Sequence, residues 1–170
     1  MSRISVRFLT PALLAAALLG AVSAHALQLA SGKVILTISG KVADKNTADA
    51  AQFDLAMIEK LPQQTFTTMT PWSKEPIKFT GPLLRDVLAA AKASGTTIKA
   101  MALNDYKTAI PLEDAQKYGV ILAHRMNDEL IPVRTKGPLF IVYPFDTKPE
   151  LQSAKFYGRS AWQLKSMDIE

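Results

Sequence analysis

The stretch Met101-Ala-Leu-Asn-Asp-Tyr-Lys-Thr-Ala-Ile-Pro111 predicts two short strands joined by a tight polar corner. Before the corner, the apolar residues Met101 and Leu103 are separated by a single residue. After it, Thr108 and Ile110 repeat the same period of two, which is typical of a strand with one buried face. We therefore expect a hairpin at the edge of a packed sheet, around which the rest of the chain is organised.

The corner itself holds an amide, a carboxylate and a phenol, on Asn104, Asp105 and Tyr106. Asn and Asp side chains bond their own backbone and tolerate unusual φ angles, so they favour turns. Binding residues tend to lie on loops that a rigid sheet holds in place. The same residues also fit a plain turn followed by a half-buried strand residue, and the pattern alone leaves both interpretations open.

Residues 1–26 have the order of a secretory signal peptide. A basic start with two arginines precedes an apolar run at residues 8–22, and Ala24-His25-Ala26 supplies the small-residue cleavage motif. The run is short for a membrane-spanning helix. We therefore expect cleavage after Ala26 and a periplasmic protein of residues 27–170, a single domain that does not span the membrane. An uncleaved N-terminal anchor is the alternative.

The chain has no cysteine. An exported domain without cysteine derives its stability from packing and not from disulfides. Thiolate nucleophiles, thiolate metal ligands and redox pairs are excluded as well. The net charge of +5 falls to +3 when the two arginines of the leader are removed, and the remaining basic residues form no run. No nucleic-acid partner is therefore expected.

The hydrophobic pattern alternates between short strands and a few short helices. Strands are expected at residues 33–40, 64–69, 77–80, 97–103, 106–110, 119–125, 130–133, 139–143 and 162–169. Asp54 is a candidate N-cap for one short helix, and a longer helix is expected between an N-cap at Thr80 and a stop at Gly95. Residues 144–153 and the Tyr157-Gly158-Arg159 segment are expected to be loops. This uneven order predicts an α+β domain with a mixed β-sheet or barrel-like core.

Several common kinds of catalytic site find no support in the sequence. His124 is the only histidine outside the leader, and it lies in a hydrophobic strand without a His or Cys partner. That setting favours a core histidine over a metal ligand. No serine lies in a G-x-S-x-G context, and neither a Walker loop nor a GxGxxG segment is present. We therefore expect no metal site, no serine nucleophile and no nucleotide-binding fold.

A dispersed set of aromatic and charged side chains remains as the candidate binding site. It comprises Trp72, Asp105, Tyr106, Arg125, Arg134, Tyr157, Arg159 and Trp162. A planar polar heterocycle can stack on an aromatic ring, while an arginine meets its carbonyl oxygen and a carboxylate accepts from its amino group. Taken singly, the residues also have ordinary explanations. Trp162 fits the start of a core strand, and Arg125 and Arg134 fit solvated surface charges.

Six segments resemble, in order, the molybdopterin-binding oxidoreductase domain of the sulfite-oxidase family. They are the strand at residues 34–40, FTGPLLRDVL at 79–88, NDY at 104–106 with IPL at 110–112, NDEL at 127–130, GPLFIVYP at 137–144 and WQLK at 162–165. The resemblance covers most of residues 34–170. It implies the α+β fold of that family and a pocket for a pterin cofactor.

The chain departs from the family at the residues on which the family's redox chemistry depends. Family enzymes attach molybdenum through a cysteine thiolate on the loop before the FTG segment, and Thr68 lies near that position here. A neutral hydroxyl does not replace a soft, anionic thiolate as a metal ligand. The family's glycine after Asp105, the second proline and arginine of its GpPlR motif, and a basic cluster for the cofactor's phosphate are also missing. These departures favour a reduced pterin over the full molybdopterin cofactor.

Cysteine-free, exported versions of this fold resemble the periplasmic pterin-responsive regulators, and residues 155–163 look similar to the ending of that group. The resemblance implies a non-catalytic protein that binds a reduced pterin and acts on the periplasmic domain of a membrane-bound cyclic-di-GMP enzyme. In this hypothesis Asp105 accepts hydrogen bonds from the pterin's 2-amino and N3 groups. Trp72, Tyr106 or Tyr157 supplies a ring face, and one of the three arginines in the set above reaches the ring oxygen.

Two other hypotheses stay open. The chain could be a molybdenum oxidoreductase that holds the metal through the dithiolene of the cofactor alone. It could also be a structural or partner-binding protein whose pocket no longer binds a ligand. The first of these is distinguished by metal content, and the second by partner binding that survives the loss of Trp72 or Asp105.

Overall fold

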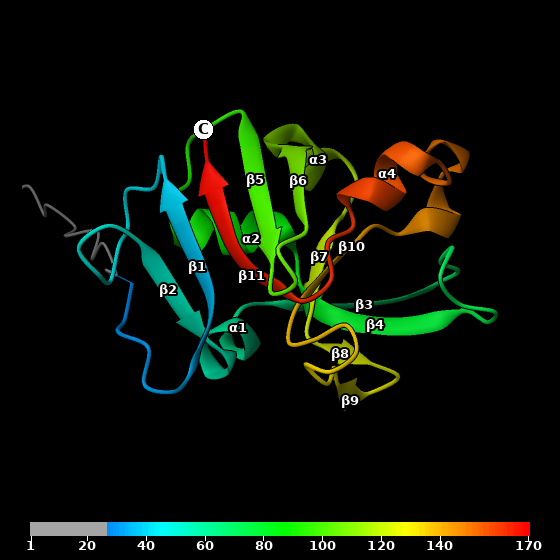
Figure 1. Ribbon diagram of the computed structural model, residues 1–170, viewed down its shortest axis with the longest axis horizontal. Coiled ribbons are helices and arrows are strands. Elements are labelled where there is room, and N and C mark those ends of the chain that lie inside the picture. Colours follow the sequence, from blue (N-terminus) through cyan, green and yellow to red (C-terminus); the bar gives the residue numbers. More distant parts are fainter. Residues whose placement is uncertain (1–26) are drawn as a thin grey trace, which may run out of the picture.

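The computed structural model describes residues 27–170, which fold as an α+β domain around three β-sheets (Figure 1). The predicted signal peptide, residues 1–26, lies outside the described residues. The expected mixed β-sheet core is confirmed. It consists of separate open sheets and not of a closed barrel. Short helices and two 3-10 turns connect the strands.

The largest sheet has five strands in the order β2-β1-β11-β5-β6. These strands are β1 (Val34–Gly40), β2 (Ala51–Asp54), β5 (Thr97–Ala102), β6 (Lys107–Pro111) and β11 (Leu164–Ile169). The first and last strands of the chain, β1 and β11, pair in parallel and lie side by side in Figure 1, whereas the other pairs are antiparallel. The two ends of the domain are therefore joined in one sheet.

The other two sheets are smaller. A four-stranded sheet, in the order β3-β4-β8-β9, contains β3 (Gln63–Thr68), β4 (Ile77–Pro82), β8 (Arg125–Met126) and β9 (Glu129–Leu130). A two-stranded sheet pairs β7 (Ile121–Ala123) with β10 (Phe140–Val142). All six residues of β7 and β10 are buried, so this pair forms the centre of the core.

The helices are short. They are α1 (Leu55–Lys60), α2 (Leu84–Ala90), α3 (Leu112–Lys117) and α4 (Ala154–Arg159), with 3-10 turns at Phe145–Thr147 and Pro149–Leu151. The predicted N-cap of α1 is confirmed, because the Asp54 carboxylate accepts a hydrogen bond from the Met57 backbone N–H at 2.9 Å. Within residues 27–170, no helix has the length and apolar character needed to cross a membrane.

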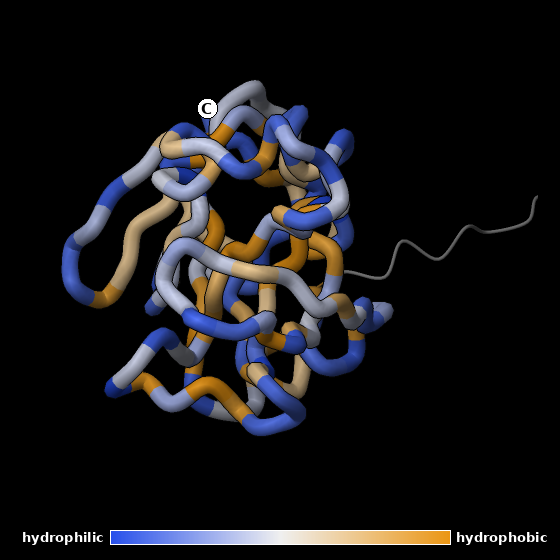
Figure 2. The backbone as a smooth tube through the Cα atoms, turned by 90° about the vertical axis from the view of Figure 1, so that its right-hand side faces the viewer, coloured by the Kyte–Doolittle hydropathy of each residue, from blue (hydrophilic) through white to orange (hydrophobic). Residues whose placement is uncertain are grey.

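One face of the five-stranded sheet packs on the core and the other is open. Leu36, Ile38 and Met167 are fully buried on the inner face. Between them lie Thr37 and Ser166, which are partly exposed on the outer face. Figure 2 shows the hydropathy of each residue along the backbone, with many hydrophilic residues in the outer turns. An antiparallel or mixed sheet with one solvated face needs this alternation.

The predicted hairpin is confirmed at the edge of the five-stranded sheet, but one of its faces is assigned wrongly. β5 and β6 pair antiparallel, with Ala100 opposite Thr108 and β6 outermost. The buried residues of β5 are Ile98, Ala100 and Ala102, while Met101 is partly exposed. The small alanines face the core, whereas the larger Met101 and Leu103 lie on the open side of the sheet. A hydrophobicity pattern alone does not reveal which of the two faces is buried.

The predicted boundaries of the longest helix are wrong at both ends. Gly81 and Pro82 complete β4, and the Thr80 hydroxyl bonds Thr65 at 2.9 Å instead of capping a helix. The helix α2 ends at Ala90, several residues before Gly95, and Lys92 takes the left-handed conformation that terminates it, with φ of 46°. The motif that resembles a helix start is thus mainly the end of a strand.

The predicted loop around Tyr157 is also wrong, because Tyr157, Gly158 and Arg159 form the last turn of α4. A six-residue helix that contains a glycine has little intrinsic stability, so its sequence gives a weak signal. Phe156 anchors it in the core. The final strand starts at Leu164 and not at Trp162, since Gln163 has a φ of 51° that interrupts the extended chain.

Gly81 provides a test of the contact between β4 and β7. A Cβ at this position would overlap the backbone carbonyl of Leu122, so the two strands would have to move apart. We predict that Gly81→Ala lowers the free energy of unfolding by about 1–3 kcal/mol, measured by urea denaturation.

The matched control is Gly32→Ala, where a Cβ would make only an ordinary contact of 3.4 Å with Asp54. It is expected to change the free energy of unfolding by less than about 0.5 kcal/mol. Equal losses for the two variants would show that the close approach of β4 to β7 is not what requires glycine.

Candidate functional site

A cavity of about 270 Å³ lies between the β5–β6 turn, α4 and the loop that joins β3 to β4. Its lining residues are Trp72, Asn104, Tyr106, Tyr157, Gly158, Ser160 and Trp162. The cavity is close to the lower end of the range for small-molecule pockets, about 300–1,000 Å³. It therefore suits one small, flat ring system.

The aromatic walls of the pocket are packed against one another. Trp72 meets Trp162 edge to face, with ring centroids 5.1 Å apart and an interplanar angle of 84°. The ring centroids of Trp72 and Tyr157 are 6.1 Å apart, and Trp72 also packs against the rings of the buried Phe140 and Phe145. Edge-to-face packing of this kind fixes ring orientations. The pocket thus has a preformed aromatic surface.

A hydrogen bond between side chain and backbone joins the two sides of the pocket. The Tyr106 hydroxyl donates to the carbonyl oxygen of Gly158 at 2.7 Å, which ties the β5–β6 turn to α4. On the same turn, the Asn104 side-chain oxygen accepts from the Tyr106 backbone N–H at 3.2 Å. Among the described residues, the amide nitrogen of Asn104 has no hydrogen-bond partner, so it remains available to a ligand.

A buried polar cluster holds α4 in place behind the pocket. The Asp114 carboxylate accepts two hydrogen bonds on one oxygen, from Arg159 and from the Tyr143 hydroxyl, each at 2.7 Å. Burial, and next the hydrogen bond to Asp114, raise the pKa of Tyr143. The phenol therefore stays protonated and acts as a donor. Arg159 is a support for the pocket wall in this arrangement.

The structure brings four of the eight predicted site residues together and separates the others. The four that line the pocket are Trp72, Tyr106, Tyr157 and Trp162. Asp105 does not line it: it is exposed, with φ of 63°, and its carboxylate pairs with Lys165 at 3.1 Å. The neighbouring Asn104 faces the pocket in its place.

None of the three predicted arginines lines the pocket either. Arg125 lies on β8, where it pairs with Glu59 at 3.0 Å. Arg134 is exposed on the segment between β9 and β10. Arg159 is engaged by Asp114, as described above. Long-range partners hold Arg125 and Arg159 in these places, and residue types alone give no sign of them.

Asn104 and Lys136 lie at the pocket but are not among the eight predicted site residues. The polar corner predicted from the sequence includes the Asn104 amide, although only Asp105 and Tyr106 of that corner belong to the predicted set. Lys136 gave no signal, yet its Nζ lies 3.9 Å from the ring centroid of Trp162 and 5.6 Å from that of Trp72. Burial lowers the pKa of Lys136, which is consistent with an ammonium group held against aromatic rings.

The described residues do not fit a molybdenum ion held by the protein. Thr68, the residue near the family's cysteine position, is buried. Its hydroxyl accepts from the Asp146 backbone N–H at 3.1 Å and donates to the Met69 carbonyl at 3.3 Å. Within residues 27–170, no group of His, Cys, Asp and Glu could hold a metal ion. The pocket lining carries no charged side chain for a phosphate.

The sequence matches a known protein family. The model of the oxidoreductase molybdopterin binding domain matches residues 28–147. The chain belongs to this family. The matched residues end before α4, so the part of the pocket that carries Tyr157 and Trp162 comes from beyond the match. Family membership supports a pterin-type cofactor for the pocket.

The fold is similar to that of a solved structure. The sulfane dehydrogenase SoxCD from Paracoccus pantotrophus matches with a TM-score of 0.60 and 16% sequence identity, over 79% of this chain and 37% of that chain. The chain thus spans little more than a third of the protein that it resembles. No curated protein matches the sequence. At this identity the likeness establishes the fold alone.

The cluster behind the pocket gives a first test of the site's construction. We predict that Asp114→Ala lowers the free energy of unfolding by about 3–5 kcal/mol, because it leaves Arg159 and the Tyr143 hydroxyl without their partner. The double variant Asp114→Leu/Arg159→Met should recover part of that loss, since it removes the unpaired charge. A loss below about 1 kcal/mol for Asp114→Ala would contradict the supporting role of this cluster.

His124 predicts a pH dependence of stability. It is buried, its Nε2 pairs with Gln63 at 2.9 Å, and its Nδ1 has no hydrogen-bond partner within the described chain. Burial lowers the pKa of His124 below its ordinary 6.5; nearby Glu59 opposes this shift and Arg125 adds to it. The folded protein then binds this proton more weakly than the unfolded chain. The contribution of neutral His124 to the free energy of unfolding is therefore complete above pH 6.5, and it is lost as the pH falls through the pKa of His124 in the folded protein.

The measurement compares the chain with His124→Gln in urea denaturation between about pH 7.5 and about pH 5. The His124→Gln variant should show the flatter decline in free energy of unfolding towards low pH. Parallel curves for the two proteins would show that His124 does not contribute to the acid sensitivity.

Proposed function

We propose that this chain is an exported, non-catalytic pterin-binding protein that reports pterin occupancy to a membrane partner. The observation that carries the proposal is the pocket itself, which is aromatic, uncharged and without a thiolate. Family membership supports the pterin class of ligand. The lack of a metal ligand among the described residues favours recognition over redox chemistry.

Each side chain of the pocket has a role in this proposal. Trp72, Tyr157 and Trp162 offer ring faces and edges to the flat pterin, and each aromatic contact contributes about 0.5–1.5 kcal/mol beyond burial. Asn104 carries both an amide donor and an acceptor oxygen. An amide of this kind complements the ring's own lactam edge, with its carbonyl oxygen and N–H. In this proposal Asn104 replaces Asp105 as the residue that hydrogen-bonds to the pterin ring.

Size and charge favour a reduced pterin over the complete molybdopterin cofactor. The cavity of about 270 Å³ suits one fused ring system with a short side chain. A phosphate is normally held by arginine, lysine or backbone N–H groups. The lining offers no basic side chain: Arg159 is paired with Asp114, and Lys136 lies over the ring of Trp162 and does not line the cavity.

The localisation and the partner in this proposal rest on the sequence patterns. The signal-peptide pattern of residues 1–26 supports export to the periplasm. The resemblance to periplasmic pterin-responsive regulators supports, as the partner, the periplasmic domain of a membrane-bound cyclic-di-GMP enzyme. A ligand in the pocket would touch both the β5–β6 turn and α4, so its binding would directly affect these two surface segments.

Calorimetry with tetrahydrobiopterin as the probe tests this function, using two neighbouring residues as a matched pair. Asn104→Ala should weaken binding by about tenfold, because the lactam edge loses its partner. Asp105→Ala should leave the affinity within about twofold, since Asp105 pairs with Lys165 outside the pocket. Tyr157→Ala, which removes an aromatic wall, should also weaken binding.

Two outcomes would overturn the assignment. Absence of any heat with reduced and oxidised pterins would remove the pterin-binding function. A loss confined to Asp105→Ala would return the recognition role to the carboxylate and contradict the geometry. Arg134→Ala, an exposed site outside the pocket, serves as the control for nonspecific effects.

A molybdenum oxidoreductase is the second candidate, and membership of the molybdopterin-binding family favours it. In that case the cofactor would hold the metal through its dithiolene alone. Elemental analysis after expression in a host that makes the cofactor separates the two. The proposed function expects molybdenum far below one atom per chain, whereas a stoichiometric content would favour the enzyme.

A further inference from the structure

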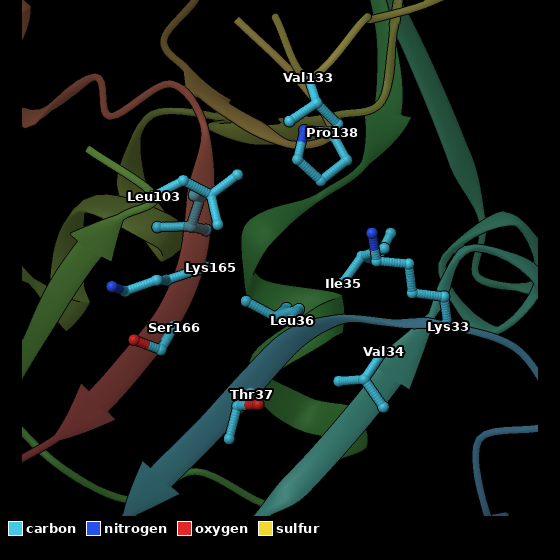
Figure 3. Close-up of a pocket in the computed structure, with 11 residues that line it drawn as sticks. Lys33, Val34, Ile35, Leu36, Thr37, Leu103, Val133, Pro138, Lys165 and Ser166 are labelled. Atoms are coloured by element: carbon cyan, nitrogen blue, oxygen red, sulfur yellow. The ribbon is translucent and has the colours of Figure 1, made fainter. Parts of the chain in front are cut away.

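A second hollow, distinct from the aromatic pocket, lies on the open face of the five-stranded sheet. It is a groove of about 430 Å³ between β1, β11 and the segment that joins β9 to β10 (Figure 3). Its apolar lining includes Val34, Ile35, Leu103, Val133, Pro138 and Leu164. Val133 and Pro138 overhang the sheet at one end in Figure 3.

The groove exposes more apolar side chain than its surroundings. Val133 is 51% exposed, Leu103 is 47% exposed and Val34 is 36% exposed. These are three of the seven large hydrophobic residues that are exposed in the described part of the chain. Apolar residues gathered in one hollow are typical of interaction sites, whereas singly scattered ones need no explanation.

The charges around the groove are basic. Lys33 and Lys165 lie on opposite sides of it in Figure 3, and no acidic residue lines it. Lys165 pairs with the exposed Asp105, and exposed pairs of this kind are weak enough to exchange partners. Within residues 27–170, Lys33 has no ion-pair partner. An occupant with negative charge at both ends and apolar groups between them would complement this surface.

The open face continues beyond the groove. A neighbouring hollow of about 460 Å³ shares Ser166 with it and is lined by Lys107 and by Lys99, which pairs with the exposed Glu170. The one acidic residue in that lining, Asp168, accepts a hydrogen bond from Ser39 at 2.7 Å. The two hollows together make a basic and apolar face across the neighbouring strands β1, β11, β5 and β6. A face that crosses four strands is covered more fully by an extended peptide segment than by a compact small molecule.

From this charge complementarity we infer that the groove docks an extended segment of a protein partner, in which acidic residues flank apolar side chains. The partner that the proposed function requires could supply such a segment, and to that extent the inference deepens the proposed function. Leu103 lines the groove, while Asn104 and Tyr106 of the same turn line the aromatic pocket. The turn therefore connects ligand and partner directly.

Selection from a displayed library of random peptides tests the groove without any pterin present. The bait is the chain purified after export. Recovered peptides should carry Asp or Glu on both sides of an apolar centre. Their affinity, measured by fluorescence anisotropy, should fall at least about tenfold for Val133→Asp, which places a buried charge at the interface. Lys33→Glu should weaken acidic peptides and favour the same peptides with lysine replacing the acids.

The controls use residues outside the groove. Leu29→Asp, at a side chain that is 77% exposed, matches Val133→Asp, and Lys45→Glu matches Lys33→Glu; both should leave the affinity unchanged. Failure to select peptides, selection of basic peptides, or equal binding to Val133→Asp would overturn the inference. So would a dimer of this chain that Val133→Asp dissociates, since a second copy would then be the occupant. None of these outcomes depends on pterin binding, so the groove and the pocket fail separately.

Discussion

One buried carboxylate determines how the candidate site is built. Asp114, on α3, accepts hydrogen bonds from Arg159 on α4 and from Tyr143 beside β10, so it links the central strands to the pocket wall. A short helix that contains a glycine has little intrinsic stability, so α4 depends on this ion pair together with the burial of Phe156. With α4 fixed, Tyr157 and Gly158 are positioned, and Gly158 receives the Tyr106 hydroxyl from the edge hairpin. The pocket is thus closed by two polar contacts that lie on either side of α4.

That construction also determines the chemistry that is available. The cluster engages Arg159, so the residues that line the pocket are neutral, and Lys136 lies over the ring of Trp162. Thr68, which the sequence resemblance places near the family's metal-binding cysteine, is engaged by backbone groups. A preformed aromatic cavity with one free amide is suited to recognising a flat heterocycle. Within the described residues, its lining carries no charged side chain and no thiol, which supports the recognition role proposed above.

Much of the fold was predictable from local patterns. The hairpin, the capping by Asp54 and the buried strand at β10 follow from alternation, turn chemistry and hydrophobicity. The failures have physical causes: α4 is short and contains a glycine, and Gly81 belongs to a strand because it packs against Leu122. In the site, the aromatic residues were found because their type alone is informative. The choice between Asn104 and Asp105 depends on a single positive φ angle, and the engagement of Arg159 depends on a partner 45 residues away, neither of which a sequence displays.

The two tryptophans of the chain, Trp72 and Trp162, both line the pocket, so tryptophan emission reports on it directly. The most direct test of the account is a titration of the chain with a reduced pterin, followed by this emission. A neutral aromatic pterin pocket predicts saturable quenching at one pterin per chain, weakened by Asn104→Ala and unchanged by Asp105→Ala. Emission that stays constant, or that declines linearly without saturation, would contradict the central claim that this cavity binds a pterin ring.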